Sequence, residues 1–387
     1  MLFRSFSIQK LLFRSFRKRT LCVVTQPSLP HDHIYEVIVS KSNDIFANLS
    51  LEEWLFENRD LSKNSVLLMW KNRPCIVIGR HQNPWLECNV SEGTALGVNI
   101  VRRGSGGGTV YHDEGNLNCS FITDKRYYDR RRNLQFVINA IMSRWDIDLQ
   151  INERDDIILD QLYKVSGTAS RLTRAKTYHH LTLLYRTDLE KLQKILTSPF
   201  GTGVNSKATK SVSAQVRNMS DYVTEMDFSK LVKVLGEHFY HEYDQRRFGE
   251  IQFVEPTDDA LFPGLDKLQS KLQDWEWIYG KTPKFLLKKH YSQTIHGTHF
   301  TVTIATEINK GRIAQLDITF LDTNQNDFIE SLLSDVRNII IGQRFWIPDL
   351  KVLLQDLQKD VTVGNHGNQD LFSWIVCCLK DAFHIHI

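Results

Sequence analysis

Apolar and polar positions along the first eighty residues predict three strands and one helix. The segment IYEVIVS, residues 34–40, alternates with the two-residue period of a strand, and the short apolar runs Val66–Trp70 and Cys75–Gly79 are typical of buried strands. The KNRP sequence between these two runs predicts a hairpin turn. After Ser42-Asn43, apolar residues recur every three or four positions over residues 45–58, which predicts a helix. The residues of that helix expected to face the core are Phe46, Leu49, Trp54 and Leu55.

Further along, shorter patterns predict the elements around a glycine-rich turn. Residues 102–121 place two arginines before three consecutive glycines and an apolar alternation after them, which predicts a strand–turn–strand. A helix is expected near Leu134–Trp145. Two short strands, Ile157–Leu159 and Leu162–Val165, are expected on either side of a tight turn, and Tyr178–Leu184 predicts another strand.

The last third of the chain predicts a smaller domain. The segment PTDDALFPG, residues 256–264, has the composition of a domain boundary. Alternating runs at 300–306 and 312–319 and a helix from Asp327 predict an α+β unit. The two tryptophans of WEW, residues 275–277, lie at strand spacing and are expected to pack on one face.

The fold class expected from the whole pattern is α+β. A large domain of mixed and antiparallel sheets flanked by helices is expected over residues 32–255, after a leader at residues 1–31. A small α+β accessory domain would follow over residues 256–347, and a C-terminal helical tail over residues 348–387.

The net charge of +3 is unevenly distributed. Residues 1–31 contain six basic residues and no acidic one, and removing those six from 48 leaves 42 basic residues against 45 acidic ones. A nucleic-acid partner is therefore not expected. The leader mixes Arg, Ser and large apolar residues, which is typical of a mitochondrial transit peptide; a flexible basic tail or a poor secretory signal are the alternatives.

Membrane and metal chemistry have no sequence signal. No stretch of eighteen apolar residues is present, so no membrane partner is expected. The six cysteines form no CxxC pair and have no metal-ligand spacing with histidine, which favours reduced thiols and no metal site. The adjacent His179 and His180 would point to opposite faces of a strand and are expected to be structural.

Three glycines carry the main candidate chemistry. Gly106, Gly107 and Gly108 lack β-carbons, so their N–H groups can converge on a phosphate or carboxylate. The segment matches neither the GxxxxGK[ST] of a P-loop nor GxGxxG. A flexible surface loop is an equally good account of the glycines taken alone.

Two further motifs support the ligand-binding account. The pattern RR-x-SGGG-x-V-[FY]-HD-x-G-N is followed by K-[VI]-SG-x-A and HH-x-T-LL, in which the lysine is Lys164. Together they resemble the lipoate–protein ligase family, within the biotin and lipoate transferase superfamily. The segments GRHQNPWLECN and WEWIYGKTPKF extend the resemblance from about Asn43 to about Ile347. These motif sequences are most similar to those of the mitochondrial lipoyltransferases of animals, one branch of that family.

The resemblance implies a biotin/lipoyl ligase-like fold and a site for lipoyl-AMP. Lys164 would be the catalytic residue, stabilising charge electrostatically rather than accepting the lipoyl group. The residues that the resemblance assigns to the phosphate and nucleotide are Arg103, Gly106, Gly107, Gly108, Thr109, Val110, Tyr111, Arg154, Thr182, Thr209 and Ser211. The residues that it assigns to the acyl pocket are Trp70, His81 and Trp85. Residues 198–219 would close over the adenosine; a plain linker is the alternative.

The implied activity is transfer of a lipoyl group to a lysine of a lipoyl domain in a 2-oxoacid dehydrogenase E2 subunit, or of glycine-cleavage H protein. The donor would be lipoyl-AMP or lipoylated H protein. A complete ligase that uses ATP and Mg²⁺ stays open, as does a non-catalytic lipoyl or acyl-adenylate binding protein. A monomer in the mitochondrial matrix is expected.

Three details of the mechanism stay open. No residue stands out as a base for the attacking amine, and His112 and Asp113 are the candidates. A cysteine acyl-enzyme is disfavoured because no cysteine lies between Lys164 and Thr182, although Cys119 lies near the glycines. The basic run Arg130–Arg132 is either a solvated part of a charged loop or a docking patch for an acidic partner.

Overall fold

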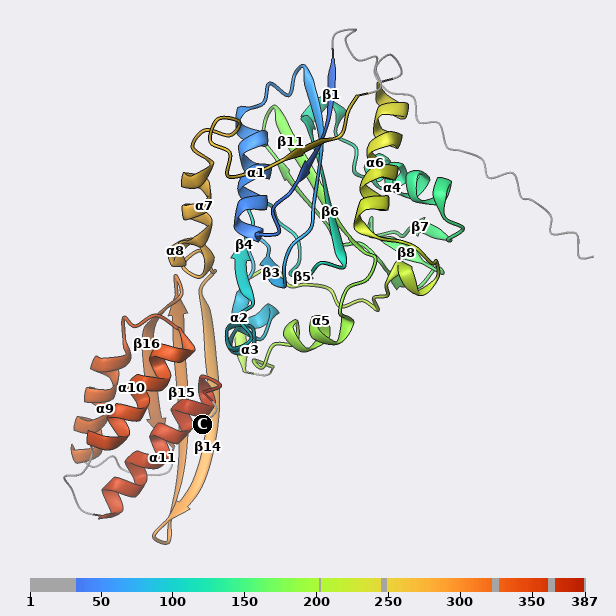
Figure 1. The fold of residues 1–387 in the computed structure, drawn as a ribbon. Coiled ribbons are helices and arrows are strands. Elements are labelled where there is room, and N and C mark those ends of the chain that lie inside the picture. Colours follow the sequence, from blue (N-terminus) through green and yellow to red (C-terminus); the bar gives the residue numbers. More distant parts are fainter. Residues whose placement is uncertain (1–32, 202, 245–248, 322–326, 361–365, 386–387) are drawn as a thin grey trace, which may run out of the picture.

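The computed structural model describes residues 33–201, 203–244, 249–321, 327–360 and 366–385 (Figure 1). The expected transit peptide, residues 1–31, lies outside these ranges. Within them, no helix is both long enough and apolar enough to span a membrane.

A six-stranded mixed sheet forms the centre of the large domain. Its strands, in spatial order, are β10 (Thr168–Leu172), β11 (Lys176–Leu184), β6 (Asn116–Asp124), β2 (Asn64–Trp70), β1 (Ile34–Ser40) and β13 (Gln252–Val254). Strand β1 pairs in parallel with β2 and β13, whereas the pairs from β2 to β10 are antiparallel. The fold class is therefore α+β with a mixed sheet, as the sequence predicted.

Strand alternation divides the core between the two faces of this sheet. Leu67 and Met69 pack with α4 (Arg130–Arg144) and α6 (Phe228–Tyr243), whereas Leu68 and Trp70 pack toward α1 (Ile45–Asn58). Helix α1 begins where predicted because the Asp44 side chain accepts the N–H of Ala47 at 2.9 Å. Figure 1 shows α4 and α6 together on one side of the sheet and α1 on the other.

The predicted hairpin at Lys71–Pro74 is wrong. Strand β3 (Cys75–Ile78) leaves the sheet of β2 and forms a separate three-stranded sheet with β4 (Asn99–Arg102) and β5 (Val110–His112). Asn72 explains the departure, since its buried amide contacts His112 Nδ1 at 3.0 Å and accepts from Asn48 at 2.9 Å. The glycine-rich segment links β4 to β5, the two outer strands of this sheet.

Smaller elements complete the large domain. They are α2 (Pro84–Glu87), α3 (Val90–Ala95), η1 (Lys125–Tyr127), β7 (Leu149–Ile151), β8 (Ile157–Leu159), β9 (Tyr163–Lys164), α5 (Leu189–Ile195) and η2 (Met219–Asp221). Strands β8 and β9 form the predicted hairpin, with Asp160 and Gln161 in the left-handed region between them. The basic run Arg130–Arg132 is not in a loop as expected, because Asp129 caps α4 and starts the helix at Arg130.

The small domain is a four-stranded sheet covered by helices. Its elements are β12 (Val204–Ser206), β14 (Phe285–Ile295), β15 (Thr298–Asn309), β16 (Arg312–Phe320), α9 (Asp327–Ile340), α10 (Ile347–Asp360) and α11 (His366–Ala382). Helix α11 packs on β14 and α10 packs on α11, so these two helices join this domain rather than forming a separate tail.

Two helices before β14 belong to the junction between the domains. Helix α7 (Leu265–Gln273) packs on α1, so the large domain extends past the expected boundary at residue 256. The tryptophans of WEW lie on a short helix, α8 (Trp275–Ile278), and not on a strand. Both still pack, since the ring centre of Trp275 lies 5.6 Å from that of Tyr279 and the Trp277 indole donates to the Arg102 carbonyl at 2.7 Å.

Arg102 ties this junction together from the end of β4. Its side chain is fully buried, and burial lowers its pKa to about 10, so it stays charged at neutral pH. The oxygens that accept from its guanidinium within 3.1 Å are the carbonyls of Gly79, Arg80, Gln82, Trp277 and Ile278 and the hydroxyl of Thr282. One side chain therefore joins the loop after β3 to the start of the small domain.

Replacing Arg102 by methionine should lower the free energy of unfolding by about 3 kcal/mol or more, because several buried oxygens lose their donor. Urea unfolding followed by circular dichroism measures this. The exposed Arg73→Met variant is the control and should shift stability by less than about 0.5 kcal/mol. Equal effects of the two substitutions would contradict the role given to Arg102.

Candidate functional site

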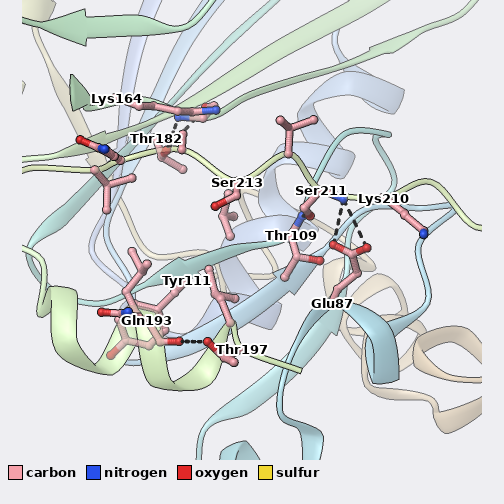
Figure 2. Close-up of a pocket in the computed structure, with 18 of the residues that line it drawn as sticks. Glu87, Thr109, Tyr111, Lys164, Thr182, Gln193, Thr197, Lys210, Ser211 and Ser213 are labelled. Atoms are coloured by element: carbon pink, nitrogen blue, oxygen red, sulfur yellow. Dashed lines mark hydrogen bonds between the residues drawn. The ribbon is translucent and has the colours of Figure 1, made fainter. Parts of the chain in front are cut away.

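Two adjoining cavities lie between the glycine turn and the β8–β9 hairpin. The smaller has a volume of about 310 Å³ and the larger about 940 Å³. Among the residues that border both are Thr109, Val110, Lys164, Gly167, Thr182 and Ser211. Figure 2 shows Lys164 and Thr182 on one side of the larger cavity and Thr109 and Ser211 on another. The two cavities therefore form one elongated site with Lys164 where they adjoin.

Arg103 shapes the glycine turn. Its buried guanidinium donates to the carbonyls of Gly106 at 2.6 Å and Gly108 at 2.7 Å, and to the carbonyl of Val77 at 3.1 Å. In a trans peptide the carbonyl and the following N–H point in opposite directions. The N–H groups of Gly107 and Thr109 therefore point away from Arg103, and that of Thr109 donates to the Ser211 hydroxyl. Arg103, which also lines the smaller cavity, fixes the orientation of these peptides.

Lys164 faces the same cavity from β9. Its ammonium lies 2.8 Å from Asp156 Oδ1, and both side chains are mostly buried. Its backbone N–H donates to the carbonyl of Gln215 at 2.8 Å, which joins the hairpin to the segment after β12. The wall of the smaller cavity includes Lys164, Gly107 and Gly108, so the lysine and the glycine turn line the same cavity.

Residues 209–216 form the third wall. The Ser211 hydroxyl accepts the N–H of Thr109 at 2.9 Å and contacts the Gln82 amide at 3.0 Å, while the Ser211 N–H donates to the Glu87 carboxylate at 3.1 Å. A β-carbon on Gly108 would come within 3.1 Å of that hydroxyl. This segment is thus seated directly on the glycine turn.

The structure brings most of the expected site residues to the cavities. Those on the wall of the smaller cavity are Trp70, Arg103, Gly107, Gly108, Thr109, Val110, Arg154, Lys164, Thr182, Thr209 and Ser211. Tyr111 borders the larger cavity.

Three expected residues border neither of these two cavities. Trp85 is fully buried in the junction between the domains, where its ring packs against the rings of Tyr279, Phe285 and Phe345. His81 is exposed, and only its carbonyl reaches the site by accepting from Thr209 at 3.2 Å. At Gly106 an added β-carbon would meet nothing within 4 Å. An apolar residue next to a site motif cannot be assigned to a pocket or to the core by its position in the sequence.

Asp156, Asn118 and Glu87 are among the residues on the cavity walls that the sequence did not single out. Asp156 pairs with Lys164, Asn118 borders the smaller cavity, and Glu87 holds Ser211. Arg130, part of the basic run, also borders the smaller cavity. The only sequence signal was the pair Asp155-Asp156 immediately before the hairpin that carries Lys164. The basic side chains on the smaller cavity outnumber the acidic ones, which suits an anionic ligand.

The candidate bases are poorly suited to proton transfer. His112 is buried, and burial lowers its pKa to about 3, so it is neutral at pH 7. Asp113 accepts from the N–H groups of Gly115 and Asp188 at 2.9 and 2.8 Å, which holds it in a structural role. Cys119 is buried on β6 and borders neither cavity, and burial raises the pKa of its thiol. The burial of Cys119 and its absence from both cavity walls argue against an acyl-enzyme at this cysteine.

The two adjacent histidines point to opposite sides of β11. His179 contacts Asn133 at 3.2 Å beneath α4, and burial lowers its pKa to about 3. His180 lies 3.0 Å from Glu52 and 3.2 Å from the hydroxyl of Ser105, beside the glycine turn. Among the described residues, no group of three or more His, Cys, Asp or Glu side chains is placed to hold a metal ion.

The two cavities together form an elongated site, and the smaller one is lined by more basic than acidic side chains. The family described as lipoyl protein ligase A/B catalytic domain matches residues 44–240. Human mitochondrial lipoyl amidotransferase LIPT1 is 35% identical over 347 residues, covering 89% of this chain and 90% of that protein. Lipoate-protein ligase A of Psychrobacter cryohalolentis is 31% identical over 343 residues, covering 88% and 97%.

The structural comparison agrees with the sequence comparison. The crystal structure of P. falciparum LipL1 in complex with lipoate has a TM-score of 0.57 and 26% identity, covering 89% of this chain and 99% of that chain. The chain therefore belongs to the lipoyl protein ligase family and is an acyltransferase.

Replacing Gly107 by alanine should lower the free energy of unfolding by about 1–2 kcal/mol, because Gly107 has a φ of 85°. An added β-carbon would also come within 3.0 Å of Arg103 Nη2. Gly106→Ala is the matched control and should be almost neutral. Urea unfolding of both variants measures the difference, and equal losses would contradict the geometry of the turn.

The buried histidines predict a loss of stability in acid. An unfolded histidine titrates near pH 6.5, whereas His112 and His179 titrate near 3 in the folded chain. Between these values the unfolded chain binds more protons, so the free energy of unfolding falls as pH falls. Urea midpoints measured from pH 7 to 4.5 should decrease less steeply for His112→Gln than for the parent. The exposed His241→Gln should keep the parent slope, and an unchanged slope for His112→Gln would contradict this account.

Proposed function

We propose that this acyltransferase moves a lipoyl group from lipoyl-AMP to a specific lysine of a lipoyl domain in 2-oxoacid dehydrogenase E2 subunits. Lipoylated glycine-cleavage H protein is the second candidate donor, and H protein is a further candidate acceptor. The observation that carries the proposal is that Lys164 and the glycines Gly107 and Gly108 line the same cavity.

The two cavities suit the two halves of lipoyl-AMP. The smaller cavity has Leu49, Trp70 and Val77 on its wall, an apolar surface for the acyl chain. Each buried methylene of the acyl chain contributes about 0.8 kcal/mol to the binding free energy, so the acyl chain can anchor the ligand. The larger cavity, with Tyr111 and Thr182 on its wall, would take the nucleotide. The phosphate would then lie where the cavities adjoin, between the glycine turn and Lys164.

The chemistry needs a fixed positive charge at that point. The acceptor amine attacks the acyl carbon, a C–N bond forms, the bond from that carbon to the phosphate oxygen breaks, and AMP leaves with its electrons. The amine must lose a proton in the process. Lys164, held by Asp156, would stabilise the negative charge on the carbonyl and phosphate oxygens.

Deprotonation of the acceptor is a separate requirement. A lysine with a pKa near 10.4 costs about 4.6 kcal/mol to be neutral at pH 7. Asp156 is the carboxylate on the wall of the smaller cavity, and its side chain is mostly buried. We assign it to positioning Lys164 and, after the amine arrives, to receiving the proton.

Two other functions fit parts of the site. A complete ATP-dependent ligase, using Mg²⁺, is favoured by the similarity to lipoate-protein ligase A. A non-catalytic binder of lipoyl or acyl-adenylate would need the cavities but not the Lys164–Asp156 pair. A mitochondrial location, in the matrix, is supported by the basic leader and by the name of the human relative. We also propose that the protein acts as a monomer.

One assay separates these functions. The purified protein is mixed with apo lipoyl domain and, in parallel, with lipoyl-AMP, with lipoate plus ATP and Mg²⁺, or with lipoylated H protein. Transfer from lipoyl-AMP without lipoate-dependent ATP–pyrophosphate exchange is expected. Exchange activity would favour the ligase, and transfer from none of the three donors would leave only the binder.

Lys164→Ala should remain folded and lose at least about a hundredfold in transfer from preformed lipoyl-AMP, since removing a single preorganised donor costs this much in other acyl transfers. Intact-mass spectrometry of the acceptor domain measures the transfer. Lys207→Ala removes an exposed lysine that borders neither cavity and is the control. Parent-like transfer by Lys164→Ala would remove the catalytic role.

A further inference from the structure

The first turn of α4 carries three arginines, which is electrostatically unfavourable for a helix. A helix N-terminus bears partial positive charge and is stabilised by acidic side chains. Helix α4 has no acidic residue in its first turn, and Arg130, Arg131 and Arg132 occupy it. Asp129 accepts the N–H of Arg132 as the cap but lies outside the turn. The arrangement therefore needs an explanation other than the stability of α4.

Packing explains only Arg132. Its guanidinium lies 3.5 Å from Glu242 and 5.2 Å from the ring centre of Tyr243, so it joins α4 to α6. That side chain is also the least exposed of the three. Arg132 is thus a structural residue on the side of α4 that faces α6.

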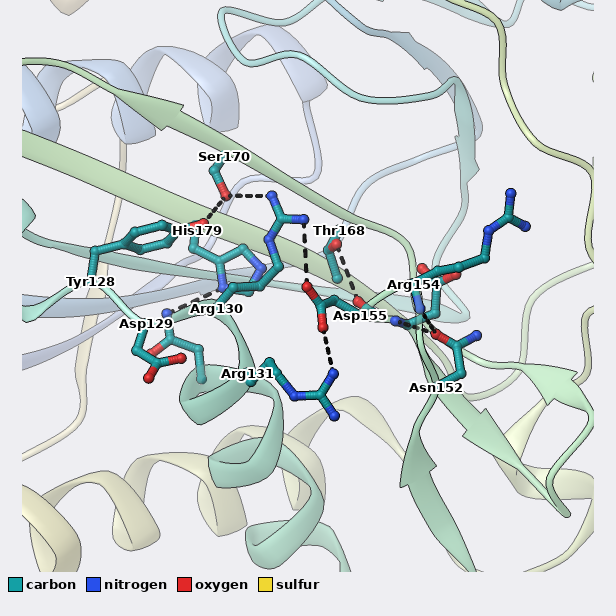
Figure 3. A network of polar contacts seen from close by, with 12 residues as sticks. Tyr128, Asp129, Arg130, Arg131, Asn152, Arg154, Asp155, Thr168, Ser170 and His179 are labelled. Atoms are coloured by element: carbon teal, nitrogen blue, oxygen red, sulfur yellow. Dashed lines mark hydrogen bonds and ion pairs between the residues drawn. The ribbon is translucent and has the colours of Figure 1, made fainter. Parts of the chain in front are cut away.

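Arg130 and Arg131 share a single carboxylate on the opposite side. Asp155 Oδ1 lies 2.9 Å from Arg131 Nη1, and Asp155 Oδ2 lies 4.0 Å from Arg130 Nη1. Figure 3 shows Asp155 between the two guanidiniums. The carboxylate is 27% exposed, whereas Arg130 and Arg131 are 38% and 58% exposed. The surface that solvent meets is therefore positive.

This surface lies at the smaller cavity. Arg130 borders that cavity together with Arg154 and Lys164, and Arg131 shares Asp155 with Arg130. The exposed Glu153 and Asp129 offset part of the charge of Arg154 and Arg130. Among the described residues, Arg131 forms an ion pair with Asp155 alone, and 58% of its side chain is exposed. An acceptor lysine, itself a cation, must approach Lys164 through this positive region. Carboxylates beside that lysine would remove the repulsion and pair with the exposed guanidiniums.

We propose that Arg130 and Arg131 form the docking surface for an acidic face of the acceptor protein, next to its target lysine. The inference rests on the proposed function and adds the contact that orients the acceptor. Asp155 holds the two guanidiniums side by side, so they can contact carboxylates on one face of the partner. Exposed charge pairs mainly accelerate association and lose their effect in salt.

The test is binding of an apo lipoyl domain to the full chain, measured by fluorescence anisotropy without turnover. Arg131→Glu should weaken binding about three- to tenfold and should reduce the dependence of Kd on salt. Arg144→Glu makes the same charge change at the other end of α4, about 21 Å away, and should bind like the parent. A Glu→Lys change beside the acceptor lysine should restore binding to Arg131→Glu.

Several results would overturn the proposal. They are no binding by the parent, parent-like Kd and salt dependence for Arg131→Glu, and equal weakening by Arg144→Glu. Arg131 borders neither cavity, so Arg131→Glu should bind a non-reactive lipoyl-AMP analogue as the parent does. An equal loss of analogue and domain binding would assign the surface to the nucleotide instead. Failure of the proposed function would appear separately, as absence of transfer by the parent.

Discussion

Two buried guanidiniums, from Arg102 at the end of β4 and from Arg103 directly after it, hold the site and the domain junction in place. Because neighbouring residues of a strand point to opposite faces, Arg102 reaches the junction and Arg103 reaches the glycine turn. The groups that accept from both side chains are uncharged carbonyls and hydroxyls. Burial lowers the pKa of each to about 10, so both remain charged. Arg103 also lines the smaller cavity, where its positive charge favours an anion.

The site is assembled from elements that meet only through tertiary packing. The glycine turn comes from the three-stranded sheet, Lys164 from the β8–β9 hairpin, and Ser211 from the segment that follows the first strand of the small domain's sheet. Backbone pairing of Lys164 with Gln215 joins the second to the third, and the bond from Thr109 to Ser211 joins the third to the first. The position of Lys164 relative to the turn is therefore set by these two hydrogen bonds, each donated by a backbone N–H, rather than by one flexible side chain.

The sequence predicted individual helices and hairpins, and the residues that line the cavities, better than it predicted which strands pair with one another. Helix α1, the β8–β9 hairpin and the opposed faces of His179 and His180 depend on periodicity and turn residues, which are local. Periodicity does not reveal which sheet a strand joins, so β2 and β3 were wrongly paired. Tryptophans two residues apart fit a strand as well as a short helix, and Trp85 next to a site motif belongs to the junction. Asp156 could not be assigned to Lys164 without the register of the hairpin.

The central claim is that Lys164 and the glycine turn bind one acyl nucleotide between them. A crystal structure with a non-reactive lipoyl-AMP analogue tests it most directly. The account predicts the phosphate within about 3 Å of both Lys164 Nζ and a backbone N–H of residues 107–109, with the acyl chain in the smaller cavity and the nucleotide in the larger. A ligand whose phosphate lies away from Lys164 or from the turn would contradict it.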